Sequence, residues 1–134
     1  MIGEIIELRK IADPRGNLTV AEQWVDVPFA VSRVYWTYDI PAGSQRGGHA
    51  HRHCREAIIA VSGSFSVTLD DGRERCAYQL NRPYQALLVD TGIWRTLDDF
   101  SSGAVCLVLA EDPFDEADYI YDYDEFIQSK SCLR

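Results

Sequence analysis

Short segments rich in Val, Ile and aromatic residues recur along this chain, and turn-forming residues separate them at intervals of about eight to twelve positions. This spacing is typical of a sandwich or barrel built from β-strands. The segments expected to be strands are 4–8, 18–23, 33–40, 57–61, 64–69, 75–80, 85–89 and 105–110. Only 123–130 is expected to be helical. The sequence therefore predicts an all-β fold with a short C-terminal helix.

The 134 residues are enough for one domain with a real core and too few for two ordinary domains. Hydrophobic residues make up 46% of the chain, which fits a folded globular protein rather than a disordered one. No apolar run is long enough to cross a bilayer, and the N-terminus lacks the basic and apolar stretches of a secretion signal. We therefore expect a cytoplasmic protein without a membrane partner.

The chain carries a formal net charge of -8, with eight acidic residues and no basic residue between positions 111 and 125. This charge argues against nucleic acid as a partner, because the phosphate backbone attracts basic surfaces. An anionic small molecule would need a locally basic site within this acidic protein. The acidic stretch is interpreted mainly as a solvated charge run, although its aromatic residues should be packed against something.

The cysteines of this chain are widely separated, and no two of them form a C-x-x-C pair that would suggest a zinc or redox site. They are Cys54, Cys76, Cys106 and Cys132. Two disulfide bridges could in principle form between them. We expect reduced thiols instead, because disulfides are rare in the cytoplasm.

Residues 43–63 add a more specific constraint. The pattern G-x5-H-x-H-x4-E-x6-G is matched at every fixed position, by Gly43, His49, His51, Glu56 and Gly63. This pattern is the first signature of the cupin barrels, so the chain resembles a cupin, and we expect a single jelly-roll domain over residues 1–134. In cupins the two histidines and the glutamate point into one pocket, where they hold a metal or act as acid and base.

His49 and His51 lie two positions apart, so both imidazoles project from the same face of an extended strand. They can therefore meet one ligand. His53 continues the same alternation, but it falls where the signature has no fixed residue. The signature therefore gives a role to the first two histidines and none to the third.

A metal site is one interpretation of these residues. A metal-binding cupin normally takes a fourth ligand, a histidine, from a later P-x-G-x-x-H signature, whereas here Gly92 is followed three positions later by Arg95. Arginine stays protonated and has no lone pair for a cation, which argues against a four-ligand centre. A triad of His49, His51 and Glu56 could still hold iron, as in dioxygenase-type cupins.

Proton transfer is the other interpretation. Histidine titrates near neutral pH, which makes it the commonest general acid and base. Two imidazoles on one strand face suit the removal of a proton beside a ketone and its return at the adjacent carbon, through an enediolate. Tyr35 is the candidate hydroxyl that would assist at the oxygens, and Arg46 and Arg95 are candidate cations for an anionic substrate. The alternative for each arginine is an exposed side chain that pairs with surface carboxylates.

The orientation of Tyr35 depends on strand 33–40, in which apolar and polar residues alternate. One face carries Val34, Trp36, Tyr38 and Ile40, and the other carries Arg33, Tyr35, Thr37 and Asp39. The polar face could line the pocket, with the apolar face against the second sheet or a partner subunit. Alternatively, Tyr35 lies at the edge of the core with its hydroxyl in water.

Longer motifs over most of the chain narrow the resemblance. They are Arg15-Gly16-Asn17-Leu18, Pro28-Phe29, Arg33-Val34-Tyr35, Arg46-Gly47-Gly48-His49-Ala50-His51, Ser62-Gly63-Ser64, Trp94, Asp99-Phe100-Ser101, Leu107-Val108-Leu109-Ala110 and Asp115-Glu116-Ala117-Asp118-Tyr119-Ile120. On these motifs the chain resembles the nucleotide-sugar 3,4-ketoisomerases, cupins similar to the C-terminal domain of the WxcM proteins. The combination of R-G-x-H-A-H and D-E-x-D-Y-I is much more specific than the cupin signature alone.

The resemblance implies a homodimeric jelly roll that converts dTDP-4-keto-6-deoxyglucose into a dTDP-3-keto-6-deoxyhexose, on the way to amino sugars of surface polysaccharides. It implies no metal and no organic cofactor. His49 and His51 would be the acid and base pair, and Tyr35 would assist at the substrate oxygens. The residues expected to bind the substrate are Arg15, Arg33, Arg46, Glu56 and Arg95.

Two positions depart from the pattern of this family. Several members carry Gln at the position of Glu56 and His at the position of Arg95. Neither change touches the two histidines, so the reaction type follows from the resemblance more directly than the substrate does. Two further alternatives remain at this stage: a binding module for sugar nucleotides without activity, and a 3,5-epimerase that shares the barrel and the substrate.

Overall fold

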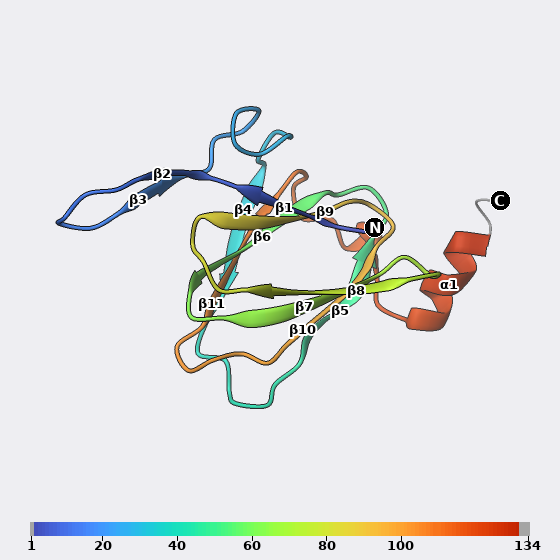
Figure 1. Ribbon diagram of the computed structural model, residues 1–134. Coiled ribbons are helices and arrows are strands. Elements are labelled where there is room, and N and C mark those ends of the chain that lie inside the picture. The colour runs from blue at the N-terminus through green and yellow to red at the C-terminus, as the bar shows by residue number, and fades with distance from the viewer. Residues whose placement is uncertain (1, 132–134) are drawn as a thin grey trace.

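Two five-stranded antiparallel sheets enclose the core of the protein in the computed structural model, which describes residues 2–131 (Figure 1). The first sheet has the order β1-β9-β6-β11-β4 and the second has the order β12-β5-β10-β7-β8. The strands are β1 Glu4–Glu7, β2 Arg9–Ile11, β3 Leu18–Val20, β4 Arg33–Thr37, β5 Arg46–His51, β6 Glu56–Ser62, β7 Phe65–Asp70, β8 Arg75–Leu80, β9 Gln85–Val89, β10 Trp94–Asp98, β11 Val105–Ala110 and β12 Tyr119–Ile120. A 3-10 helix, η1, spans Glu116–Asp118, and one α-helix, α1, spans Tyr123–Ser131.

The core lies between the two sheets because alternate residues of their strands point inward. In β7, Phe65, Val67 and Leu69 are fully buried, and they meet Ile58 of β6 and Leu87 of β9 in one apolar cluster. The outer face of the first sheet is also covered, by a segment that carries Val27 and Phe29. This arrangement confirms the predicted all-β jelly roll with a short C-terminal helix.

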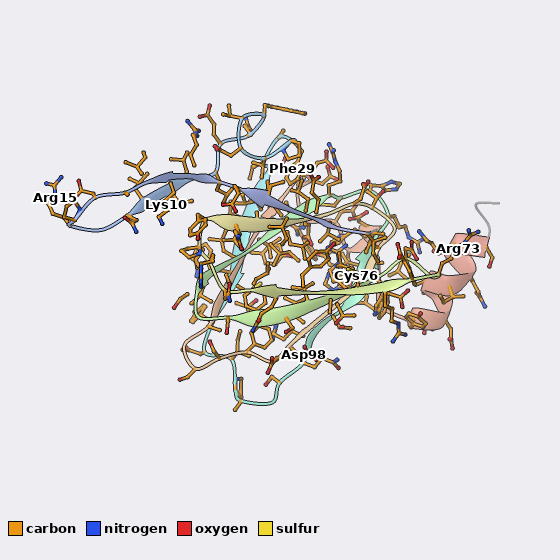
Figure 2. The ribbon with its side chains drawn as sticks, viewed as in Figure 1. Lys10, Arg15, Phe29, Arg73, Cys76 and Asp98 are labelled. Carbon is orange, nitrogen blue, oxygen red and sulfur yellow. The ribbon has the colours of Figure 1, made fainter. Side chains whose placement is uncertain are left out.

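The hairpin of β2 and β3 stands apart from the barrel. These two strands pair only with each other, and in Figure 1 they extend away from the sheets as a separate arm. Arg15 lies at the tip of this arm (Figure 2). Ile11 and Leu18 on the arm are both more than half exposed. The arm therefore leaves apolar side chains uncovered within the single chain.

The observed strands differ from the predicted ones in two ways: some were not predicted, and some are shorter than predicted. The sequence did not predict β2, β5, β10 or β12 as strands, and β5 contains two glycines with positive φ, Gly47 and Gly48. Pairing with neighbours on both sides, β10 and β12, makes β5 a strand despite this composition. Segment 33–40 ends as a strand at Thr37, because Asp39 adopts a left-handed φ of 55°.

The described cysteines, Cys54, Cys76 and Cys106, are free thiols, as the sequence predicted, and Cys132 lies outside the described residues. Burial raises the pKa of Cys106 to about 12, so this thiol stays protonated. Within residues 2–131, no helix has the length and hydropathy that a membrane span requires.

Candidate active site

Strands from both sheets bring most of the predicted site residues around one cavity. The cavity has a volume of about 90 Å³, and its lining residues are Tyr35, Thr37, Arg46, Gly47, His49, Glu56, Ile58, Arg95, Leu97, Phe100, Cys106 and Val108. Tyr35 comes from β4, His49 from β5, Glu56 from β6 and Arg95 from β10. The inward alternation of four separate strands therefore builds this site.

A bulge between β5 and β10 sets the position of His49. The register of the pair shifts between Arg95 and Thr96, and His49 lies opposite Arg95. Gly47 has a φ of 82°, and a Cβ at this position would come within 3.0 Å of the Arg95 carbonyl oxygen. The R-G-G-H sequence therefore allows the close approach that places His49 beside the arginine.

Glu56 is the centre of a buried polar network. Its Oε2 accepts a hydrogen bond of 2.8 Å from the Tyr35 hydroxyl, and its Oε1 accepts one of 2.7 Å from Arg95 Nη1. Burial opposes the charge of Glu56, but contacts with His51 and Arg95 outweigh it and lower the pKa to about 2. Burial, followed by the charge of Glu56, raises the pKa of Tyr35. Glu56 is therefore ionised, and the neutral Tyr35 hydroxyl directs its proton toward it.

Arg95 is not an unpaired cation, although the sequence analysis proposed it as one that could bind an anionic substrate. Its side chain is 1% exposed, Nη1 pairs with Glu56, and Nη2 donates to the Ile93 carbonyl oxygen at 3.1 Å. The guanidinium thus already has a buried carboxylate as its counter-ion. Arg95 lines the cavity, and its expected contact with a substrate remains a prediction.

His49 is the histidine that lines the cavity. It lines the cavity and also a wider outer cleft, and its Nε2 has no hydrogen-bond partner among the described residues. Burial, together with the charge of Arg95, lowers the pKa of His49 to about 4. At neutral pH this side chain is therefore an uncharged imidazole with a free nitrogen, which suits a general base.

His51 has a different environment, although its ring centroid lies 5.0 Å from that of His49 in a perpendicular arrangement. The side chain is fully buried. Its Nδ1 lies 2.7 Å from Oδ2 of Asp118, and its Nε2 lies 3.4 Å from Oε1 of Glu56. The two predicted histidines are therefore adjacent, but only His49 lines the cavity.

Aromatic side chains line the outer cleft, which has a volume of about 400 Å³. Its lining residues are Arg33, Tyr35, His49, Phe114 and Tyr119. The Arg33 guanidinium carbon lies 5.5 Å from the centre of the Phe114 ring, which is 63% exposed. Tyr119 lies 4.4 Å from His51 between ring centroids. Residues of the acidic stretch therefore form one wall of the site, which the sequence analysis did not assign to them.

Three other candidates, two arginines and one histidine, lie outside the cavity or at its rim. Arg15 is 90% exposed at the tip of the arm, where it pairs with Asp13, so it does not reach the cavity of its own chain. His53 is exposed outside the cavity, in agreement with the lack of a role for it in the signature. Arg46 is exposed and lies at the rim of the cavity, where it could meet an anionic group.

The alternative of a metal site can be tested on the donor atoms. His49, His51 and Glu56 each offer a ligand atom, and these atoms lie within 4.8 Å of one another. However, Arg95 Nη1 already occupies Oε1 of Glu56 at 2.7 Å. A cation at this position would compete with a buried guanidinium for the same carboxylate and would be repelled by its charge. The residues present therefore fit a metal ion poorly.

Comparison with known proteins agrees with the motifs in the sequence. Residues 1–131 match the family FdtA, described as WxcM-like, C-terminal. TDP-4-oxo-6-deoxy-alpha-D-glucose-3,4-oxoisomerase from Aneurinibacillus thermoaerophilus is 39% identical over 126 residues, which cover 94% of this chain and 91% of that protein.

Two solved structures of 3,4-ketoisomerases of TDP-linked sugars are similar to this chain along nearly its whole length. A mutant of the 3,4-ketoisomerase QdtA from Thermoanaerobacterium thermosaccharolyticum, in complex with TDP-4-keto-6-deoxyglucose, has a TM-score of 0.94 at 34% identity and covers 97% of this chain and 94% of its own. WlaRB, a TDP-quinovose 3,4-ketoisomerase from Campylobacter jejuni, has a TM-score of 0.89 at 41% identity and covers 94% and 97%. The predicted resemblance is confirmed: the chain belongs to the WxcM-like, C-terminal family of cupins, among whose members are 3,4-ketoisomerases of TDP-linked sugars.

Proposed function

We propose that this protein is a sugar-nucleotide 3,4-ketoisomerase that acts on dTDP-4-keto-6-deoxyglucose. The observation that carries the proposal is His49, a neutral imidazole with a free Nε2 where the inner cavity meets the outer cleft. The similarity to 3,4-ketoisomerases along nearly the whole chain supports the choice of reaction and substrate.

The reaction moves a ketone from C4 to C3 of the sugar. His49 removes the proton from C3, the electrons of the C–H bond form a C3–C4 double bond, and the charge moves to O4 to give an enediolate. A proton then returns at C4, while O3 loses its proton and O4 gains one. One proton has moved between the carbons and one between the oxygens, so the reaction needs no oxidant or reductant.

The roles of the remaining site residues follow from their partners. His51, the second member of the predicted pair, is buried next to His49 and does not line the cavity. It influences the reaction through its neighbours His49 and Glu56 and exchanges no proton with the sugar carbons itself. Tyr35 directs its proton to Glu56, so its oxygen can accept a hydrogen bond from a sugar hydroxyl. Arg46 at the rim and Arg33 in the cleft would bind the diphosphate, and Phe114 would stack on the base.

A homodimer is part of the proposal. The face of β4 that points away from the cavity carries Val34 and Trp36, which are 46% and 56% exposed, and the arm exposes further apolar side chains. A second copy would cover these surfaces. In such an assembly Arg15 could meet the substrate only in the site of the partner. We also expect a cytoplasmic location and a product that is used for amino sugars of surface polysaccharides.

Incubation of the protein with the 4-keto sugar nucleotide in deuterated water tests the function. We expect a 3-keto product with solvent deuterium at C4, observed by NMR. Exchange at C5 would instead indicate a 3,5-epimerase. Binding of the nucleotide sugar without any product or exchange at C3 would refute the isomerase and leave a binding module.

A further inference from the structure

Asp118 has a buried carboxylate that the proposed chemistry does not use. It belongs to the D-E-x-D-Y-I motif and lies at the end of η1, directly before β12. Its side chain is 8% exposed, and its Oδ2 lies 2.7 Å from Nδ1 of His51, which is 67 residues away in the sequence. A short contact between a buried carboxylate and a buried imidazole fixes the orientation of the ring.

The backbone around Asp118 holds the carboxylate in place. Its Oδ1 accepts a hydrogen bond of 2.6 Å from the backbone N–H of His53, and its carbonyl oxygen accepts one of 2.8 Å from the N–H of Arg52. The next residue, Tyr119, pairs with His51 across β12 and β5. Both carboxylate oxygens therefore have fixed donors, and the chain on either side is hydrogen-bonded to the strand that carries the histidine.

These contacts decide which nitrogen of His51 is oriented toward the site. A carboxylate can only accept, so the contact requires a proton on Nδ1. The ring then points Nε2 toward Oε1 of Glu56 at 3.4 Å, and the other oxygen of Glu56 accepts from the Tyr35 hydroxyl. Because Glu56 is also an acceptor, the contact with Asp118 fixes the proton on Nδ1 and the direction of the ring, and it does not set the state of Nε2. Polar side chains thus lie one after another from Asp118 through His51 and Glu56 to Tyr35 at the cavity, although Nε2 of His51 makes no hydrogen bond among the described residues.

We infer that Asp118 is a positioning residue: it keeps a proton on Nδ1 of His51 and holds the ring so that Nε2 points toward Glu56. Asp118 does not line the cavity, and it acts only through His51. The inference depends on the proposed function for its effect on turnover, but the proton on Nδ1 of His51 can be observed in the protein without any substrate.

Asp118→Asn is the variant that tests the inference most directly. The backbone N–H of His53 remains a hydrogen-bond donor in this variant, so it decides how the asparagine is oriented. The asparagine must turn its oxygen toward that N–H, which places its NH₂ group against Nδ1 of His51. Two donors cannot face each other, so Nδ1 of His51 should lose its proton, and the proton of a neutral ring would then lie on Nε2. The substitution thus preserves the shape of the side chain and removes the proton from Nδ1.

The experiment combines NMR of isotope-labelled histidine with steady-state kinetics. The chain has 3 histidines, and His49→Asn and His53→Asn variants assign their signals. We expect a proton on Nδ1 of His51 in the original protein and none on Nδ1 in Asp118→Asn, with kcat lowered about 100-fold and KM nearly unchanged. Asp115→Asn is the matched control, because Asp115 caps the same 3-10 turn through the N–H of Ala117 and does not contact His51.

Asp118→Ala provides a second, independent measurement. Asp118 borders a surface cleft of about 440 Å³ that it shares with His53, so a small carboxylate can enter the vacated space. Added formate should restore part of the lost kcat in Asp118→Ala and none in His49→Asn. An Asp118→Asn variant that keeps both the Nδ1 proton and the turnover would overturn the inference, as would a loss of activity that Asp115→Asn reproduces. If the original protein shows no turnover, the proposed function fails, while the NMR result still decides the role of Asp118.

Discussion

The floor and the mouth of the site are built in different ways. The floor consists of His51, Glu56 and Arg95, all of which are at most 1% exposed and are joined by contacts of 2.7 to 3.4 Å. The mouth consists of Arg33, His49, Phe114 and Tyr119 around the open outer cleft. The floor fixes geometry before a ligand arrives, whereas the mouth is open to the ligand and contains His49, whose Nε2 has no partner among the described residues.

The largest effect is expected at the mouth, from His49→Asn. Loss of the general base should lower kcat about 1,000-fold, because proton transfer by a positioned side chain contributes on that order. The melting temperature should change little, since Nε2 of His49 has no partner among the described residues. Steady-state kinetics and thermal unfolding measure both quantities. His53→Asn is the control, and equal losses in the two variants would contradict the role of His49.

A double-mutant cycle at Glu56 and Arg95 is expected to have the next largest effect, this time on the floor. Glu56→Gln leaves the buried Arg95 guanidinium without its partner and should lower the free energy of unfolding by about 3 kcal/mol. Adding Arg95→His should recover much of this loss, because the buried charge is then removed. Urea unfolding of the four proteins gives the coupling energy, and additive effects would show that the pair is not a unit.

This pair shows what the sequence could and could not reveal. The departures at Glu56 and Arg95 were visible as two separate changes from the family pattern, but 39 positions separate them, and only the fold shows that they are partners. The histidines and the glutamate were predictable because a strand of period 2 fixes which side chains share a face. Alternation alone could not decide the orientation of Tyr35, and the structure places it toward the cavity with Trp36 outside.

The wall of the mouth was harder to predict. Phe114 and Tyr119 lie in a stretch whose acidic composition indicated a solvated surface. Their place in the site depends on β12, a strand of two residues that pairs with β5 across nearly 70 positions, and no local propensity specifies such a pairing. The D-E-x-D-Y-I motif indicated that this stretch belongs to the family pattern, but it did not indicate where its side chains lie in space. The floor, in contrast, had a signature with fixed spacing.

Phe114→Ala tests whether the mouth binds the nucleotide part of the substrate. Stacking of a base on an aromatic side chain is worth about 1 to 3 kcal/mol, so KM should rise about tenfold or more with little change in kcat. Because the ring is 63% exposed, the stability of the fold should not depend on it. Phe114→Tyr retains the ring and should behave like the original protein. A fall in kcat without a change in KM would place Phe114 in the chemistry instead.

The pH dependence of kcat/KM should separate His49 from an ordinary histidine. Its base form exists above its pKa, which burial and the charges of Arg95 and His51 lower to about 4, although the carboxylate of Glu56 opposes them. We therefore expect a constant kcat/KM between pH 8 and pH 6. If the base were a histidine with a pKa of about 6.5, kcat/KM would fall roughly fourfold over this range. A midpoint near 6.5 would mean that the mouth does not desolvate His49 in solution.

Removal of metal ions should have the smallest effect. Dialysis against a chelator is expected to leave kcat and KM unchanged, because the Arg95 guanidinium occupies the Glu56 oxygen that a cation would need. Metal analysis of protein prepared without a chelator completes the measurement. Stoichiometric iron with activity that returns on its addition would favour the dioxygenase-type alternative. The same assay on Arg95→His then sharpens the comparison: this variant frees the carboxylate and adds an imidazole, so metal binding in it alone would show that Arg95 keeps cations from the floor.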